Sequence, residues 1–221
     1  MIPPRDKVMV CMPVKSHFGQ CTGNIQGMIQ CLDYYSRPLM VVGQSNISLA
    51  RNELAHTFLE KFPEFEWSMW IDSDIVFTPE DWLTLWEGDE EVVSACYSRK
   101  VLGEPATEFG LGFTRVHRSV FEKIKELTTD DGQEHAQRFY HKGAMLVNYF
   151  PNGANPAGRW LGEDHGFFML ASLTDCKPRL EKRTKLRHVG EIEFGYPNQI
   201  PVEMLLKLLT QAGFTIAETP A

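Results

Sequence analysis

One stretch of this sequence decides how its fold and chemistry are interpreted: Trp67-Ser68-Met69-Trp70-Ile71-Asp72-Ser73-Asp74-Ile75-Val76-Phe77. Its apolar part predicts a strand that is buried on both faces. The run then ends in two carboxylates, which repel each other unless a cation lies between them. Carboxylate oxygens suit Mg²⁺ or Mn²⁺, so Asp72 and Asp74 indicate a metal site that faces a phosphate group. The simpler alternative is that both acids begin a turn and cap the next helix.

Two strand-and-helix units precede this stretch. Residues 8–14 and 39–43 are apolar runs that predict strands, and residues 22–35 and 46–61 predict the helices that follow them. The alternation of strand and helix predicts a mostly parallel sheet with right-handed crossovers. We expect the buried helix faces to consist of these residues: Ile25, Met28, Ile29 and Leu32 in the first helix, and Ile47, Ala50, Leu54 and Phe58 in the second. Arg51 and Asn52 fall off the second face.

The segment Thr78-Pro79-Glu80-Asp81 is a helix start with its own capping box. Because Thr78 and Asp81 already form that cap, Asp72 and Asp74 are not needed for it. This observation favours the metal site over the capping alternative.

The second half of the chain predicts strands over residues 91–97 and 110–116, followed by a short helix capped by Ser119. Residues 149–162 are rich in turn-forming residues and resemble a lid over a site. Residues 201–212 predict a closing helix that is structural.

Three charged features of this half have two interpretations each. Glu163 and Asp164 are either acids that the macrodipole stabilises at a helix start or the source of a general base. The basic residues are either a solvated face or a phosphate-binding patch. His188 is either a hydrogen-bonded histidine or a metal ligand. The basic residues are Lys177, Arg179, Lys182, Arg183, Lys185 and Arg187.

Composition places the chain among ordinary globular proteins. It has 221 residues, of which 43% are hydrophobic and 23% charged, so a single domain is expected. No apolar run is long enough to cross a bilayer, and no signal sequence is evident, so we expect a cytoplasmic protein. Its five cysteines show no C-x-x-C pair, so we expect them to be reduced and to serve packing. A net charge of −7 gives no general attraction to nucleic acid.

Five motifs, in this order, resemble the GT-A family of nucleotide-sugar-dependent glycosyltransferases, including its compact bacterial and phage members. The first is the strand that ends at Pro13, and the second is Ser48-Leu49-Ala50-Arg51-Asn52. Asp72-Ser73-Asp74 is similar to the D-x-D motif, and Gly162-Glu163-Asp164 to the x-E-D motif. His188-Val189-Gly190 is similar to the late histidine of the metal site. Each motif is weak alone, and the ordered set is more specific.

The resemblance implies a single GT-A (Rossmann-like) α/β domain over residues 1–221. Residues 1–100 would bind the nucleotide sugar and residues 101–221 the acceptor. The activity would be Mn²⁺- or Mg²⁺-dependent transfer from a nucleoside-diphosphate sugar, with UDP-sugars favoured, to a hydroxyl acceptor. A hydroxymethylated base in phage DNA is one such acceptor, and a phage protein would then act in the host cytoplasm.

The resemblance also assigns roles to individual residues. Asp74 and His188 would ligate the metal, and Asp72 would contact it through water or bind the ribose. In an inverting enzyme Asp164 would be the catalytic base, assisted by Glu163, whereas in a retaining enzyme Asp164 would position the substrate. The remaining donor-site residues are Pro13, Lys15, Arg51, Ser73 and Lys100, and the acceptor-site residues are Arg159, Trp160 and Glu163.

Other classes of protein share parts of this pattern. A haloacid-dehalogenase-like phosphatase also uses D-x-D with Mg²⁺, but on its first strand rather than after two strand-and-helix units. A nucleotidyltransferase shares the α/β plan but carries a glycine-rich, basic loop after its first strand, which residues 14–23 match poorly. A non-catalytic sugar-binding module would keep the fold without metal-dependent turnover.

Overall fold

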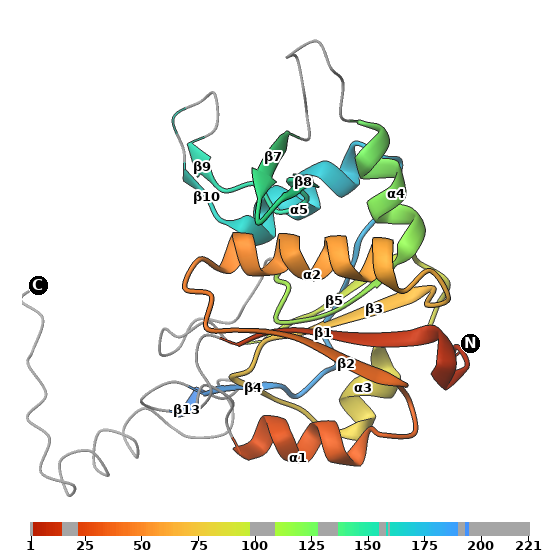
Figure 1. Cartoon of the computed structure of the whole chain (residues 1–221). Coiled ribbons are helices and arrows are strands. Elements are labelled where there is room, and N and C mark those ends of the chain that lie inside the picture. Colours follow the sequence, from red (N-terminus) through yellow and green to blue (C-terminus); the bar gives the residue numbers. More distant parts are fainter. Residues whose placement is uncertain are drawn as a thin grey trace, which may run out of the picture.

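A six-stranded sheet forms the centre of the computed structural model (Figure 1), which describes residues 2–14, 22–97, 109–127, 137–154, 158, 160–189 and the backbone of 193–194. The strand order is β11-β5-β6-β3-β1-β2. β6 is antiparallel to both of its neighbours, whereas the other pairs are parallel. Five strands therefore run in one direction, which confirms the mostly parallel sheet. Their bounds are β1 Val8–Val14, β2 Arg37–Val42, β3 Trp67–Ile71, β5 Val92–Ala95, β6 Phe113–His117 and β11 Arg179–Glu181.

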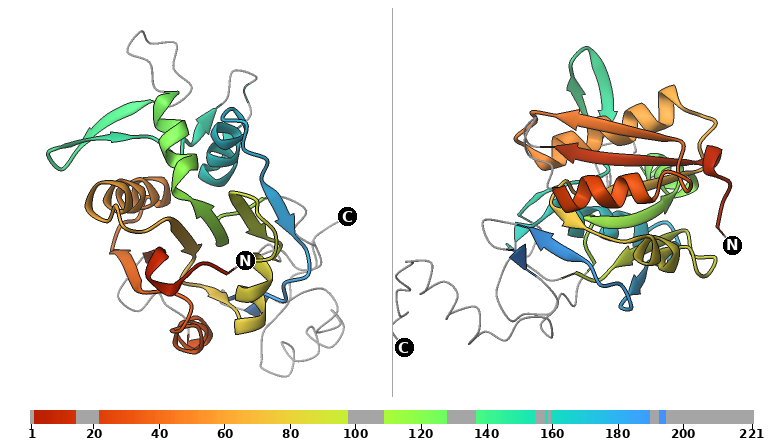
Figure 2. Two further views of the ribbon diagram at one scale, coloured as in Figure 1. Left: turned by 90° about the vertical axis from the view of Figure 1, so that its right-hand side faces the viewer. Right: turned by 90° about the horizontal axis from the view of Figure 1, so that it is seen from below.

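Helices cover both faces of this sheet (Figures 1 and 2). One face carries α2 Ile47–Lys61, α4 Arg118–Glu126 and α5 Glu163–Ser172, and the other carries α1 Thr22–Gln30 and α3 Pro79–Leu85. Two apolar clusters result, one on each face. Trp70 of β3 belongs to the first cluster and Met69 to the second, so β3 is buried on both sides as predicted.

Smaller strands extend this framework. β4 Ile75–Val76, β12 Arg187–Val189 and β13 Glu193–Phe194 form a three-stranded sheet in the order β13-β12-β4. β7 Arg138–His141 pairs with β8 Ala144–Val147, and β9 Gly153–Ala154 pairs with β10 Trp160–Leu161. The expected turn-rich stretch 149–162 thus contains a short strand pair. A 3-10 helix, η1 Arg5–Lys7, precedes β1.

The predicted buried face of the first helix is wrong. Of its four residues only Met28 is buried, and Ile29 is 61% exposed. α1 instead packs through a small and polar face that includes Asn24 and Gly27. A Cβ atom on Gly27 would lie 2.7 Å from the Phe77 carbonyl oxygen, so only glycine permits this close approach to the chain beyond β4. Ile25 and Leu32 are also exposed.

The second helix agrees with its predicted start but not with its predicted polar face. Asn46 accepts a hydrogen bond from the Leu49 backbone N–H, as expected of a cap. Arg51 and Asn52 are each 1% exposed, although the helical pattern placed them outside the buried face. Asn52 Oδ1 accepts a hydrogen bond from the Tyr149 backbone N–H, so the chain after β8 covers this side of α2.

Other local predictions are tested at helix starts and cysteines. The capping box of Thr78 and Asp81 is present. The cap of α4 is His117 rather than Ser119, because β6 runs one residue further than predicted and the His117 imidazole accepts from the Ser119 N–H. The cysteines at 11, 31, 96 and 176 are free and buried.

Some predictions are not tested by this structure. The predicted helix 201–212 and residues 128–136 lie outside the described residues. Among the residues that are described, no helix has the length and apolar character needed to span a membrane. The sheet takes strands from both predicted halves, 1–100 and 101–221, and their separate roles stay a prediction.

Arg118 ties the carboxyl end of α2 to α4. Its guanidinium donates hydrogen bonds to the carbonyl oxygens of Phe58, Leu59, Phe62 and Phe65 and lies 4.4 Å from the ring centre of Phe58. Carbonyl groups at a helix end have no partner within the helix, so this side chain replaces several missing bonds at once.

We therefore expect Arg118→Ala to lower the free energy of unfolding by about 1–3 kcal/mol, measured by urea denaturation. Lys125→Ala is the control, because Lys125 and Glu60 form an ion pair in which both side chains are about half exposed. Equal stability of the two variants would contradict the capping role.

Candidate functional site

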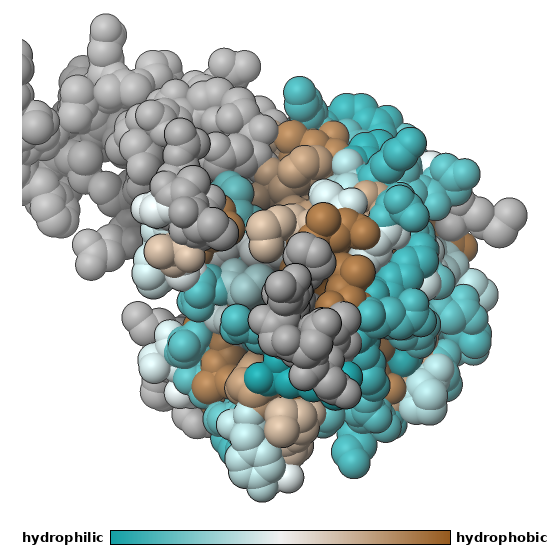
Figure 3. Space-filling view, turned by 90° about the horizontal axis from the view of Figure 1, so that it is seen from above, coloured by the Kyte–Doolittle hydropathy of each residue, from teal (hydrophilic) through white to brown (hydrophobic). Residues whose placement is uncertain are grey.

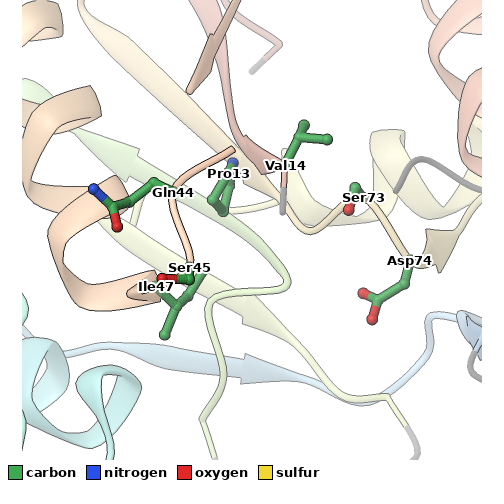
Figure 4. A pocket seen from close by; sticks show the side chains of 7 residues that line it. All are labelled: Pro13, Val14, Gln44, Ser45, Ile47, Ser73 and Asp74. Carbon is green, nitrogen blue, oxygen red and sulfur yellow. The ribbon is translucent and has the colours of Figure 1, made fainter. Parts of the chain in front are cut away.

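The carboxyl ends of β1, β2 and β3 lie at one edge of the sheet, which is where ligands bind in open α/β sheets. A pocket of about 160 Å³ lies at this edge (Figure 4). It is lined by Pro13, Val14, Gln44, Ser45, Ile47, Ser73 and Asp74. Three of the residues predicted from sequence, Pro13, Ser73 and Asp74, thus surround the same space.

The turn between β3 and β4 holds the two acids of the D-x-D motif apart. The Ile75 N–H donates to the Asp72 carbonyl oxygen at 3.1 Å, and the amide of Asn24 donates to the carbonyl oxygens of Asp72 and Ile75. Asn24 is fully buried on α1. Hydrogen bonds from α1 therefore fix the turn, and its two carboxylates make different contacts.

Asp74 contacts His188. Oδ2 of Asp74 lies 3.2 Å from Nε2 of His188, and both side chains are largely buried. β12 places the histidine there because Arg187 pairs with Val76 and His188 with Ile75 in an antiparallel register. The Val189 N–H also donates to the Asp74 carbonyl oxygen at 2.8 Å. Two residues that are 114 positions apart in the chain therefore meet, as the sequence predicted.

Asp72 contacts Arg51 instead. Nη2 of Arg51 donates to both carboxylate oxygens of Asp72, at 2.9 and 3.2 Å. The same guanidinium lies 3.7 Å from Oε1 of Glu163 and 3.6 Å from Oδ1 of Asp164, both at the start of α5. One buried cation thus joins three carboxylates that come from the D-x-D and x-E-D motifs.

The charged groups in this cluster shift one another's pKa values. Burial raises the pKa of Asp164 to about 6, even though the charge of Arg51 acts in the opposite direction. Burial also raises the pKa of Asp72 above its usual value. Burial alone would lower the pKa of Arg51, but the three carboxylates outweigh it and raise that pKa. Asp164 is therefore a carboxyl group that can take up and release a proton near neutral pH.

Arg51 has a different environment from the one the sequence suggested. Its side chain is 1% exposed and surrounded by acids, so its visible contacts are those of a group that organises carboxylates. Among the described residues, Nη1 of Arg51 and Oδ1 of Asp164 are buried without a hydrogen-bond partner. The cluster consequently retains polar atoms that a ligand or water can satisfy.

The remaining predicted residues are either separate or not described. Trp160 lies on β10, two residues before the cap of α5, and is 75% exposed. Figure 3, which looks onto the layer containing α5 and β7–β10, shows apolar side chains between hydrophilic ones on this side of the molecule. The residues Lys15, Lys100 and Arg159 lie outside the described residues.

Two members of the basic run before His188, Arg179 and Arg183, are already paired with carboxylates, and a phosphate-binding role of the run stays a prediction. Arg179 lies 2.9 Å from Glu90 and 2.6 Å from Glu181, and Arg183 lies 2.7 Å from Glu87. These guanidinium groups therefore neutralise the glutamates beside β11.

Sequence reasoning missed three residues that shape the site. Asn24 fixes the acidic turn, and nothing in its helical pattern marked it. Tyr97 follows β5, and its ring lies edge-to-face on His188 with centroids 5.6 Å apart. Gly112 accepts a hydrogen bond from the Asp72 N–H and donates one to the Tyr97 hydroxyl. The position of Tyr97 and Gly112 at the ends of predicted strands was the available signal.

The residues fit a divalent metal ion in part. Asp74 and His188 offer one carboxylate oxygen and one imidazole nitrogen at 3.2 Å, a donor set suited to Mn²⁺. Asp72 is already bound to Arg51, which agrees with an indirect role for it. Within the described part of the chain, no three His, Cys, Asp or Glu side chains are grouped so that they could hold a metal by themselves. A metal here would need ligand oxygens from a bound substrate or water.

The sheet and its flanking helices define a mixed α/β protein with a GT-A-like fold. Searches find no protein family and no curated protein that matches the sequence. Among solved structures, A197 from STIV is similar with a TM-score of 0.52 and 16% sequence identity, covering 83% of this chain and 86% of that chain. A glycosyltransferase involved in the glycosylation of the major capsid of PBCV-1 has a TM-score of 0.37 and 15% identity, covering 57% and 68%. The similarity to A197 shows a shared fold.

Replacing Arg51 tests the electrostatic design of this cluster. The pKa of Asp164, about 6, exceeds that of an unfolded aspartate, so the folded chain binds more protons and stability falls as pH rises through this window. Arg51 opposes this effect. We expect Arg51→Met to lower the free energy of unfolding by about 3–5 kcal/mol at pH 8 and by less at pH 5, where Asp164 is protonated.

Urea unfolding at the two pH values measures this difference. Lys7→Met is the matched control, because it removes a cation from an exposed pair with Glu66 and should cost little at either pH. The same loss of stability for Arg51→Met at pH 5 and pH 8 would show that the guanidinium does not compensate Asp164.

Proposed function

We propose that this protein is a metal-dependent glycosyltransferase that moves a sugar from a nucleoside-diphosphate sugar to a hydroxyl acceptor. The observation that carries the proposal is the meeting of two groups at one sheet edge: the Asp74–His188 pair and the cluster of Arg51 with Asp72, Glu163 and Asp164. The GT-A-like fold supports it. The motif order from sequence supports it as well, because these residues come from four of the five motifs.

The Asp74–His188 pair would hold Mn²⁺ or Mg²⁺ at the donor side. A bound divalent ion would offset the negative charge that builds on a departing diphosphate. The neighbouring pocket, lined by Pro13 and Ser73, would take part of the nucleotide. Its volume of about 160 Å³ is below the roughly 300–1,000 Å³ of complete ligand pockets, so it fits one portion of a donor. We propose a UDP-sugar as that donor.

Asp164 would accept the proton of the acceptor hydroxyl. Its raised pKa and its position at the start of α5 fit a general base that works near neutral pH. Glu163, held at 3.7 Å from the same guanidinium, would assist it or contact the acceptor. Arg51 would keep both acids in place. This assignment applies to an inverting reaction, in which a carboxylate takes the proton as the sugar carbon is attacked.

The acceptor would bind on the side of α5 and β10. An exposed Trp160 close in sequence to Glu163 offers an apolar surface on which a sugar ring or a base can stack. Arg159 is proposed as an acceptor contact from sequence. A hydroxymethylated base in DNA is one acceptor to test, although the net charge of −7 does not favour a polyanion. Transfer assays with saccharide, lipid-linked, protein and modified-DNA acceptors would decide among these.

The most direct test is donor binding with and without metal. We expect one of the UDP-, GDP-, CMP- or dTDP-sugars to raise the melting temperature in the presence of Mn²⁺, because a ligand that binds only the folded state stabilises it. Asp74→Ala should remove this metal-dependent increase and the associated donor hydrolysis while keeping the fold. Asp33→Ala, which alters an exposed acid, is the control. Full Mn²⁺-dependent binding by Asp74→Ala would contradict the metal assignment.

Asp164→Asn tests the base separately. We expect this variant to bind the donor nucleotide normally and to transfer sugar about 10²-fold more slowly or worse. In the parent protein the transfer rate should rise as pH increases through about 6, because only deprotonated Asp164 accepts a proton. The variant should lack this rise. Wild-type rates in Asp164→Asn would exclude Asp164 as the base.

A further inference from the structure

Tyr97 contacts the proposed metal side of the site but has no role in the mechanism above. It follows β5, at the sheet edge that carries Asp72 and Asp74. Its ring meets the imidazole of His188 edge-to-face, with the two planes at 86°. Such aromatic pairs have a preferred geometry, so the tyrosine ring restricts how the imidazole can turn. His188 is the residue whose Nε2 points to Asp74.

The hydroxyl of Tyr97 is connected to the other group of the site. It accepts a hydrogen bond from the Gly112 N–H at 3.1 Å, and the Gly112 carbonyl accepts one from the Asp72 N–H at 2.9 Å. A Cβ atom on Gly112 would lie 2.7 Å from Tyr97 Oη and 3.1 Å from Asp72 Oδ2. The hydroxyl and the Asp72 carboxylate therefore converge on the same glycine.

The backbone around this hydroxyl is fixed by buried hydrogen bonds. Ser94 Oγ donates to the Gly110 carbonyl and accepts from the Gly110 N–H, and Thr114 donates to the same carbonyl. A Cβ atom on Gly110 would lie 2.5 Å from Tyr97 Oη. Gly110 and Gly112 together leave the room that a tyrosine hydroxyl needs at this position.

The hydroxyl stays protonated in this environment. Burial, together with the charges of Asp164 and Asp72, raises the pKa of Tyr97 well above its ordinary value. Tyr97 thus accepts from Gly112 while keeping a proton to donate. This charge state agrees with the geometric role but is not needed for it.

We propose that Tyr97 is a positioning residue that orients the His188 imidazole toward Asp74 and fixes the distance between that pair and Asp72. The identity of the ligand rests on the proposed function, whereas the orientation of His188 does not. The rival interpretation is that Tyr97 is ordinary packing at the end of β5. The two differ in whether His188 responds when the ring is removed.

Two substitutions separate the ring from the hydroxyl. Tyr97→Phe keeps the ring, and Tyr97→Leu removes both. The first readout is the ¹H–¹⁵N imidazole spectrum of the metal-free protein, in which His188→Gln identifies the His188 signal. The second is the dissociation constant of Mn²⁺ alone, measured by electron paramagnetic resonance. Tyr140→Leu is the control, because Tyr140 on β7 is 72% exposed.

We expect Tyr97→Leu to shift the His188 signal and to weaken Mn²⁺ binding about 3- to 10-fold, the range of one aromatic contact. Tyr97→Phe should leave the His188 signal at its position in the parent protein, since the ring is retained. Tyr140→Leu should change neither readout. An unchanged His188 signal and Mn²⁺ affinity in Tyr97→Leu would overturn the proposal.

Gly110→Ala provides a second route should Tyr97→Leu not fold. The new methyl group meets the hydroxyl at 2.5 Å but the ring carbon that bears it at 3.1 Å. Gly110→Ala should therefore shift the His188 signal in the parent protein and much less in the Tyr97→Phe background. Equal shifts in both backgrounds would count against the proposal. If no donor sugar is ever transferred but these shifts appear, the proposed function fails and the positioning role stands.

Discussion

A single buried guanidinium holds the candidate site together. Arg51 lies on α2, Asp72 follows β3, and Glu163 and Asp164 begin α5, so one side chain connects three elements from distant parts of the sequence. Like charges at these distances repel strongly when water is excluded. When all three carboxylates are ionised, the buried cation among them offsets this repulsion and lets them remain near one another.

This constraint explains how α2 and α5 are arranged. α2 must bring a charged residue inward, and the chain after β8 covers it through Asn52 and Tyr149. α5 must begin close to Asp72, because Glu163 and Asp164 are the first residues after its Gly162 cap. Charge neutralisation and positioning thus depend on one residue, because the guanidinium that neutralises the acids also contacts each of them.

The sequence predicted the framework better than the contacts. Hydrophobic runs and the Thr78–Asp81 capping box located β1, β3 and α3, since these depend on neighbouring residues alone. The burial of Arg51 was not predictable from helical spacing, because it depends on acids that lie 21, 112 and 113 positions away. The face of α1 was misjudged for a similar reason, as Gly27 packs against Phe77 from another element.

The meeting of His188 with Asp74 came from motif order and not from any local pattern, and the structure supplies its physical cause. β4 and β12 pair through two residues each, and His188, which bears the imidazole, is one of the paired residues of β12. In a ladder, neighbouring side chains alternate between faces, so a shift of one position would turn the imidazole to the opposite side. An insertion or deletion of one residue before β12 would therefore turn the imidazole away from Asp74. The segment between β11 and β12 resists such a shift, because Thr184 Oγ1 donates to the Cys96 carbonyl oxygen and the Lys185 N–H donates to Asp81 Oδ1.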